Sequence, residues 1–269
     1  MNIEAKAHTH PYKKLSIQVS LNGLSFCVSD TIANTVIKTN KLEFKTTSTP
    51  YLLLKELKGL LRQEKLLNQE YEEVRVVHRN NLYSLVPKSL FDKDELPNYL
   101  KFNAKLLAND EIIYDELPNK EIVCVYVPFT NVNNYLLECF GEFEFKHNSI
   151  AMLDALFHQK SNKTICYAHV SNKFMELAVL EERKLVLYNQ FDYKTKEDFL
   201  YYILFTYEQL GLHVEEIKLK LFGAVEEGDS IYNICYQYLK KVSVFIPKFG
   251  NCDLEGLNNS NIDLTLLGN

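Results

Sequence analysis

Alternating apolar and polar residues near the start of the chain predict a β-hairpin. Residues 15–19 and 24–28 are two short apolar runs, and Asn22-Gly23 lies between them. An Asn-Gly pair supplies the positive φ angles that a tight primed turn requires. Residues 36–44 have a similar composition and are expected to add a third strand.

The pattern then changes to the spacing of an amphipathic helix. Ser48 or Thr49 is expected to cap it, with Pro50 in the first turn, where a missing N–H costs nothing. One face of this helix carries leucines at helical spacing. These leucines are Leu53, Leu57, Leu60, Leu61 and Leu67.

The middle of the chain alternates between strand and helix patterns. Residues 120–128 are almost continuously apolar, which is typical of a central strand covered on both faces. Residues 72–87 are expected to form a strand, a turn and a second extended piece, and residues 142–146 a short strand. A short helix is expected to open at 92–95, and longer helices are expected at 130–140 and 149–157.

The order of elements then starts again. Two apolar runs, 164–170 and 174–180, flank a hinge of Ser171, Asn172 and Lys173. Thr195 is expected to cap a helix that ends at Gly211. The remaining expected elements are strands at 184–192, 216–222 and 242–246, and a helix at 230–241.

The two halves match in the order of their elements. Hinges at Asn22 and Asn172 differ by 150 positions, helix caps at Thr49 and Thr195 by 146, and the next strands, near residues 74 and 217, by 143. Such a slowly drifting offset indicates a duplicated unit with small deletions. We therefore predict an α/β fold with one lobe at residues 12–160, a second at 161–250, and a tail at 251–269.

Three stretches carry a resemblance to a known family. They are KLSIQVSLNGLSFCV, EIVCVYVPFTNVNNYLLECFGEFEFKHNSIAMLDALF and KLFGAVEEGDSIYNICYQYL. Over about residues 10–250 the chain resembles an uncharacterised bacterial family with an actin-like ATPase fold. The resemblance implies two ribonuclease-H-like lobes with mixed sheets. The chain is also similar to the pilus-assembly members of that superfamily, which serve as scaffolds.

The same resemblance implies where a nucleotide would bind. Actin-like proteins hold ATP between their lobes, with a hairpin turn of each lobe against the phosphates and an aspartate at each hairpin for Mg²⁺. The matching positions are Ser20, Asn22 and Gly23 in the first hairpin, Ser171 and Asn172 in the second, and Gly223 at the adenosine side.

These signatures are degenerate. Neither turn contains an aspartate, the second turn has no glycine, and Gly223 is followed by Ala224 where the superfamily has a second glycine. We therefore expect no strong ATPase activity and a role in protein–protein contacts. The alternative is an ATP-binding enzyme or nucleotide-gated switch that uses the interlobe cleft and takes acids from elsewhere. Its nearest acidic candidates are Asp30, Asp154 and Asp229.

The sequence argues against nucleic-acid binding, nuclease activity and membrane insertion. The chain has 30 Lys and Arg against 35 Asp and Glu, a net charge of −5, so binding to a nucleic-acid backbone is not expected. A ribonuclease-H-like nuclease needs a carboxylate on its first hairpin, and residues 15–28 contain none. No apolar run reaches the roughly 18 residues that would span a bilayer, so we expect no membrane insertion.

The cysteines favour a reducing compartment. None of the six lies in a Cys-x-x-Cys pair, and Cys27, Cys124 and Cys166 fall within expected strands. Buried thiols of this kind are typical of cytoplasmic proteins, so a cytoplasmic location is expected.

The remaining polar candidates are expected to be structural. His8 and His10 have no third metal ligand nearby, His147 is expected to form a structural hydrogen bond, and His169 is expected to be a core or turn histidine. The acids at 226, 227 and 229 precede a helix, where they favour its dipole. The helix around residues 199–210 is apolar on most sides, which suits a helix that lies between lobes or under a partner.

Overall fold

The computed structural model describes residues 12–102, 104–159, 161–246 and 266. By their internal contacts these residues form two compact units, with the break between Ala151 and Met152. This break lies inside helix α4, Asn148–Phe157, whereas the sequence placed the boundary after this helix, at residue 160.

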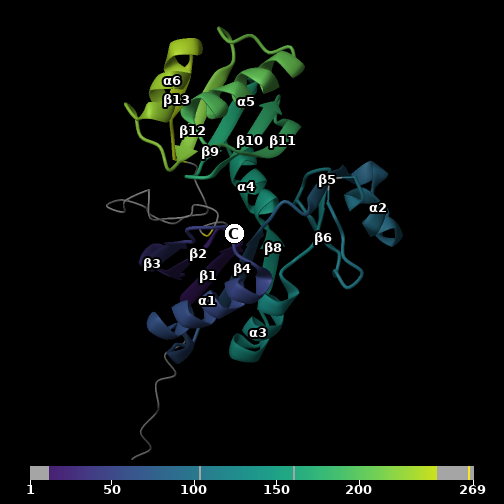
Figure 1. Cartoon of the computed structure of the whole chain (residues 1–269), viewed down its shortest axis with the longest axis vertical. Coiled ribbons are helices and arrows are strands. Elements are labelled where there is room, and N and C mark those ends of the chain that lie inside the picture. The colour runs from purple at the N-terminus through teal and green to yellow at the C-terminus, as the bar shows by residue number, and fades with distance from the viewer. Residues whose placement is uncertain (1–11, 103, 160, 247–265, 267–269) are drawn as a thin grey trace, which may run out of the picture. The chain divides into compact units, whose positions relative to one another are not determined.

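The first unit is built on a five-stranded mixed sheet with the order β3-β2-β1-β4-β8 (Figure 1). β1 pairs antiparallel with β2, and β2 with β3, whereas β4 runs parallel to both β1 and β8. The strands are β1 Lys13–Ser20, β2 Gly23–Asp30, β3 Thr35–Glu43, β4 Glu73–Arg79 and β8 Glu144–His147.

Two helices, α1 Pro50–Gln63 and α3 Thr130–Phe140, pack on the apolar face of this sheet. Thr49 caps α1 as expected, because its hydroxyl accepts a hydrogen bond from the N–H of Leu52 at 3.3 Å. Four of the five predicted leucines are buried, and Leu67 packs at the edge of the same core. The buried four are Leu53, Leu57, Leu60 and Leu61.

A small three-stranded antiparallel sheet is inserted between β4 and β8. Its order is β5-β7-β6, so the apolar strand predicted around residues 120–128 is central, as expected. Residues 123–126 of this strand are fully buried. The inserted elements are β5 Tyr83–Pro87, two 3-10 turns at Lys88–Leu90 and Lys93–Glu95, α2 Leu96–Leu100, β6 Ile113–Glu116 and β7 Ile122–Tyr126; a further 3-10 turn, Leu66–Asn68, follows α1.

The second unit repeats the first, with strand order β11-β10-β9-β12-β13. α5 Lys196–Gln209 and α6 Ser230–Tyr238 pack on the apolar face of its sheet (Figure 1). Thr195 and Asp198 form a reciprocal capping box at the start of α5. The strands are β9 Ile165–Val170, β10 Phe174–Glu181, β11 Lys184–Asp192, β12 Lys218–Gly223 and β13 Val242–Val244.

The strand registers confirm the duplication in detail. Adding 151 to the residue numbers of the six β1–β2 pairs from Lys14 to Val19 gives all six pairs of the β9–β10 ladder, so that Val19 opposite Leu24 becomes Val170 opposite Met175. Both outer ladders are interrupted by a β-bulge, after Val28 in one unit and after Val179 in the other, again 151 apart. A bulge inserts one unpaired residue and bends the strand. The same irregularity at the same place indicates a common ancestral unit.

The first hairpin turn differs from our prediction. Ser20 pairs with Gly23, so the two turn residues are Leu21 and Asn22, and neither Asn22 nor Gly23 has a positive φ. Gly23 is required for another reason: a Cβ atom there would lie 2.5 Å from the carbonyl oxygen of Leu42 on β3. Close approach of a neighbouring strand, and not a left-handed backbone, explains this glycine.

The register also corrects the alignment of the hinges. With an offset of 151, Ser20 matches Ser171, and Asn172 matches Leu21 instead of Asn22.

Five cysteines among the described residues are free thiols, and four of them are buried. Cys252, His8, His10 and the predicted tail apart from residue 266 lie outside the described residues. No helix in the described ranges combines the length and apolar character needed to cross a bilayer.

Candidate functional site

The tip of the first hairpin brings together Ser20, Asn22 and Gly23, three of the predicted site residues. The N–H of Asn22 donates to the hydroxyl of Ser20 at 3.2 Å, so it is used inside the turn. The carbonyl oxygens of the two turn residues accept hydrogen bonds from the N–H groups of Ser48 and Phe44, at 2.7 and 3.0 Å. The segment before α1 therefore fixes the tip.

The second hairpin tip is also closed by internal hydrogen bonds. Ser171 donates its N–H to the carbonyl of Phe174 at 3.0 Å, and its own carbonyl accepts a hydrogen bond from the hydroxyl of Tyr193. Gly223, at the end of β12, pairs with Val170 at the end of β9, directly before Ser171. The structure thus places Ser171, Asn172 and Gly223 at one edge of the second sheet.

Among the glycines that the structure describes, Gly223 is the one most tightly enclosed by neighbouring atoms. Its φ is +94°, a conformation that side-chain-bearing residues rarely adopt. A Cβ atom at this position would lie 2.5 Å from the carbonyl oxygen of Val170 and 2.7 Å from Cδ2 of His169. Backbone conformation and lack of space therefore both require glycine here.

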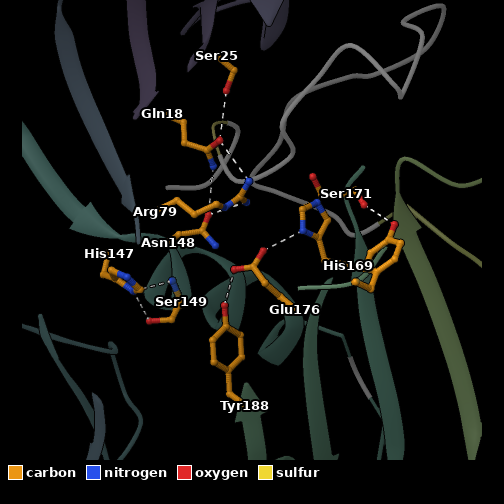
Figure 2. A network of polar contacts seen from close by, with 11 residues as sticks. Gln18, Ser25, Arg79, His147, Asn148, Ser149, His169, Ser171, Glu176 and Tyr188 are labelled. Atoms are coloured by element: carbon orange, nitrogen blue, oxygen red, sulfur yellow. Dashed lines mark hydrogen bonds and ion pairs between the residues drawn. The ribbon is translucent and has the colours of Figure 1, made fainter. Parts of the chain in front are cut away.

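A buried polar cluster lies on the face of the first sheet that is opposite α1 and α3, and it includes residues of β1 and β2. Arg79 donates to the side-chain oxygens of Gln18 at 3.3 Å and of Asn148 at 2.9 Å. Gln18 also donates to Asn148 at 3.2 Å and accepts from Ser25 at 3.4 Å. Figure 2 shows Gln18, Arg79 and Asn148 pointing toward one another.

A second buried cluster occupies the corresponding face of the other sheet. Glu176 on β10 lies between two partners: His169 Nδ1 is 2.9 Å from one carboxylate oxygen, and the hydroxyl of Tyr188 donates to the other at 2.8 Å (Figure 2). The pair of Gln18 and Ser25 becomes His169 and Glu176 when 151 is added. Both units therefore carry a cross-strand pair of polar residues at the same position of the hairpin.

Two further histidines hold the first unit together. His147 contacts the hydroxyl of Ser149 through Nδ1 at 2.8 Å, and its backbone N–H donates to Asp115 of the inserted sheet at 2.7 Å. His78 is fully buried, and burial lowers its pKa to about 3. The predicted hydrogen bond of His147 with its neighbourhood is confirmed, and His169 is buried, as expected of a core histidine.

Comparison with known proteins places the chain in a family. A family model described as "Protein of unknown function (DUF3822)" matches residues 3–242. The chain belongs to this family. No match was found among curated proteins.

Solved structures share the fold of this DUF3822 protein. A Bacteroides thetaiotaomicron protein "with actin-like ATPase fold and unknown function" superposes with a TM-score of 0.77 at 21% identity, covering 90% of this chain and 93% of that one. A structure of the "PilM-PilN type IV pilus biogenesis complex" superposes with a TM-score of 0.56 at 11% identity, covering 94% and 96%. The predicted actin-like fold and family resemblance are confirmed.

Two of the three acids considered for a metal in the DUF3822 chain take part in local turns, and the third lies in a helix. Asp30 accepts the N–H groups of the two residues at 32 and 33, at 2.8 and 2.7 Å, and Asp229 accepts the N–H of Glu226 at 2.8 Å. Asp154 lies within α4. Within the described ranges, no three His, Cys, Asp or Glu side chains are grouped so that they could hold a metal ion.

The buried polar residues beside the two hairpins were not predicted from the sequence. Arg79, Asn148 and Glu176 are polar residues within or beside apolar runs, and each is buried. A buried charged residue normally requires partners, so a charge interrupting a strand pattern was the available signal.

Proposed function

We propose that this protein is a scaffold that acts through protein–protein contacts and binds nucleotide weakly or not at all. The observation that carries the proposal is that a backbone N–H group at each hairpin tip already donates a hydrogen bond to an acceptor within the same hairpin. In a phosphate cradle such groups point at anionic oxygens. Here the N–H of Asn22 is bonded to Ser20 and that of Ser171 to Phe174. Neither turn offers a carboxylate for Mg²⁺.

An aromatic surface of the second unit supports the contact role. Tyr201 and Phe205 stack on the outside of α5 with ring centroids 5.9 Å apart, and they are 59% and 42% exposed. Tyr236 on α6 is 61% exposed and stacks on Tyr232. Exposed aromatic residues are enriched where proteins bind one another. A solved structure of the same fold comes from a type IV pilus biogenesis complex, which fits a role in protein–protein contacts. We propose that this protein acts in the cytoplasm.

Two measurements test this proposal. Thermal unfolding with ATP or ADP and Mg²⁺ should leave the melting temperature unchanged, because only a ligand that binds the native state raises it. A photo-crosslinking residue at Tyr201 should give a discrete adduct in the native host. The same residue at Tyr51, which is 76% exposed on α1, is the matched control. A clear nucleotide-dependent rise in melting temperature, or equal crosslinking at both positions, would contradict the scaffold proposal.

One observation favours the alternative, a nucleotide-gated switch. Ser171 and Asn172 follow the end of β9, and Gly223 ends the adjacent strand β12, so three of the residues expected to contact a nucleotide lie close together. If ATP raises the melting temperature, and Ser171→Ala or Ser20→Ala removes that rise in a folded variant, the switch is the better assignment.

A further inference from the structure

The second sheet ends in an edge strand, β11, with which no strand among the described residues pairs on the outer side (Figure 1). The N–H of Tyr193 donates to the carbonyl of Lys173, just before β10, at 3.2 Å. Because peptide groups alternate in direction along a strand, the N–H and C=O groups of Tyr188, Gln190 and Asp192 face away from β10. Such a row of backbone groups is a template for a further strand.

The edge strand of the first sheet, β3, has the same construction but a different charge. Both edges contain a bulge and an asparagine side chain that accepts an outward-facing N–H. β3 also carries Lys38 and Lys41, and lysine is a usual protection of an edge strand against pairing. The strand registers match these lysines to Leu187 and Gln190 of β11. Residues 185–191 contain no charged side chain, so β11 lacks this protection.

The two ends of β11 carry opposite charges. Lys184 begins the strand and Asp192 ends it, and both are exposed. Two β11 strands that run antiparallel with Tyr188 opposite Tyr188 bring Lys184 of each copy opposite Asp192 of the other. Tyr188 is an outward-facing residue, as this register requires, and opposite charges across an antiparallel pair stabilise it. β11 is therefore complementary in charge to a second copy of itself.

A row of aromatic rings leads from β11 to the outside of α5. Phe191 of β11 stacks on Tyr202 of α5, with ring centroids 4.5 Å apart. Tyr202 contacts Tyr201, which stacks on the exposed Phe205, at centroid distances of 5.4 and 5.9 Å. Because the two-fold axis of an antiparallel strand pair is perpendicular to the sheet, a second copy adds its own α5 to the same face. Aromatic surface of the two helices would then be removed from water.

We propose that two copies of this protein pair through β11 and form a symmetric dimer. The two five-stranded sheets become one continuous sheet, with β11 of each copy antiparallel to that of the other. This inference rests on the proposed contact role of the second unit and names the partner as a second copy of the chain. β3, which is protected by its lysines, does not take part.

Sedimentation equilibrium of the purified full-length protein at increasing concentration tests the association. We expect one equilibrium between monomer and dimer. Val186→Lys places a charge on the unprotected edge, at a side chain that is 44% exposed, and should leave a monomer at concentrations where wild type is mainly dimeric. Ile37→Lys is the matched control, because Ile37 lies at the same bulge of β3 and is 51% exposed. This variant should associate like wild type.

A charge exchange tests the register. Asp192→Lys puts like charges opposite each other at both ends of the strand pair, and the dissociation constant of the dimer should rise about tenfold. Adding Lys184→Asp restores opposite charges and should return the constant to near the wild-type value. Rescue of this kind is not expected if the two residues act only within their own strand.

Three results would overturn the dimer: a monomer at every concentration, equal loss of association in Val186→Lys and Ile37→Lys, or no rescue by the charge exchange. A monomer that still forms a discrete crosslink from Tyr201 to a different host protein would overturn the dimer and leave the scaffold proposal standing. A dimer whose melting temperature rises with ATP would support the dimer and contradict the scaffold proposal. The two proposals can therefore fail separately.

Discussion

His78 donates its Nε2 hydrogen to the side-chain oxygen of Asn133, 2.9 Å away on α3. The backbone N–H of Phe129 donates to the other ring nitrogen, Nδ1, at 3.2 Å. Because Nδ1 must accept, the imidazole is neutral in the folded protein. Protonation would remove this acceptor at the start of α3 and place a charge in the core of the first unit.

Stability should therefore fall in acid because of His78. Its pKa is about 3 in the folded protein, below the ordinary 6.5, so the unfolded chain takes up the proton first. The contribution of His78 is complete above pH 6.5 and is lost as pH falls toward 3, at about 1.4 kcal/mol per pH unit. His78→Gln, which keeps a donor and an acceptor, should lose about 2 kcal/mol less than wild type between pH 7 and pH 5. Urea unfolding at both pH values measures this difference, and parallel losses would refute it.

Gly223→Ala should destabilise the protein more than Gly228→Ala. The two glycines have nearly the same φ, +94° and +95°, but nothing lies within 4 Å of a Cβ built at Gly228. Gly228→Ala should therefore show only backbone strain, about 1 kcal/mol. Gly223→Ala adds overlap with Val170 and His169, for a further cost of about 1–3 kcal/mol. Denaturation midpoints of the two variants measure the difference, and equal midpoints would mean that the site relaxes freely.

Gly23→Ala should cost stability through contact with β3. The added methyl group would meet the carbonyl oxygen of Leu42, and overpacking of this kind costs about 1–3 kcal/mol. Gly59→Ala, on the open side of α1, should instead stabilise the protein by about 0.5–1 kcal/mol. If Gly23→Ala stays as stable as wild type and loses tight ATP binding, the hairpin is a phosphate loop after all.

Purified protein should release phosphate from ATP no faster than a buffer control. The reason is that neither hairpin turn contains an aspartate to hold Mg²⁺ or its waters. A malachite-green assay with and without Mg²⁺ checks this expectation. Sustained Mg²⁺-dependent turnover that Ser20→Ala abolishes, in a variant that stays folded, would show that catalysis takes place at the hairpin.

The local pattern of the sequence was enough for most elements. Hydrophobic alternation located the strands, and Thr49-Pro50 and Thr195 marked the starts of α1 and α5. These signals are local, since they depend on the period of one element and the residues that cap it. Their recurrence along the chain predicted the duplication, which the strand order and the paired bulges confirm.

Features that depend on residues far apart in the sequence, such as close strand contacts and buried hydrogen bonds, were decided only by the tertiary structure. The Asn-Gly pair predicted a positive φ at Gly23, which the structure does not have. Glycine is required at this position because the carbonyl oxygen of Leu42, on another strand, leaves no room for a Cβ atom. Asp115 of the inserted sheet binds the N–H of His147 on β8, and burial raises the pKa of this carboxyl to about 6. The periodicity of a sequence shows which face of a helix or strand is buried. It does not show which polar atom of another element will bind a polar side chain on that face. The buried pairs behind the hairpins, His169 with Glu176 among them, arise only when separate strands align in register.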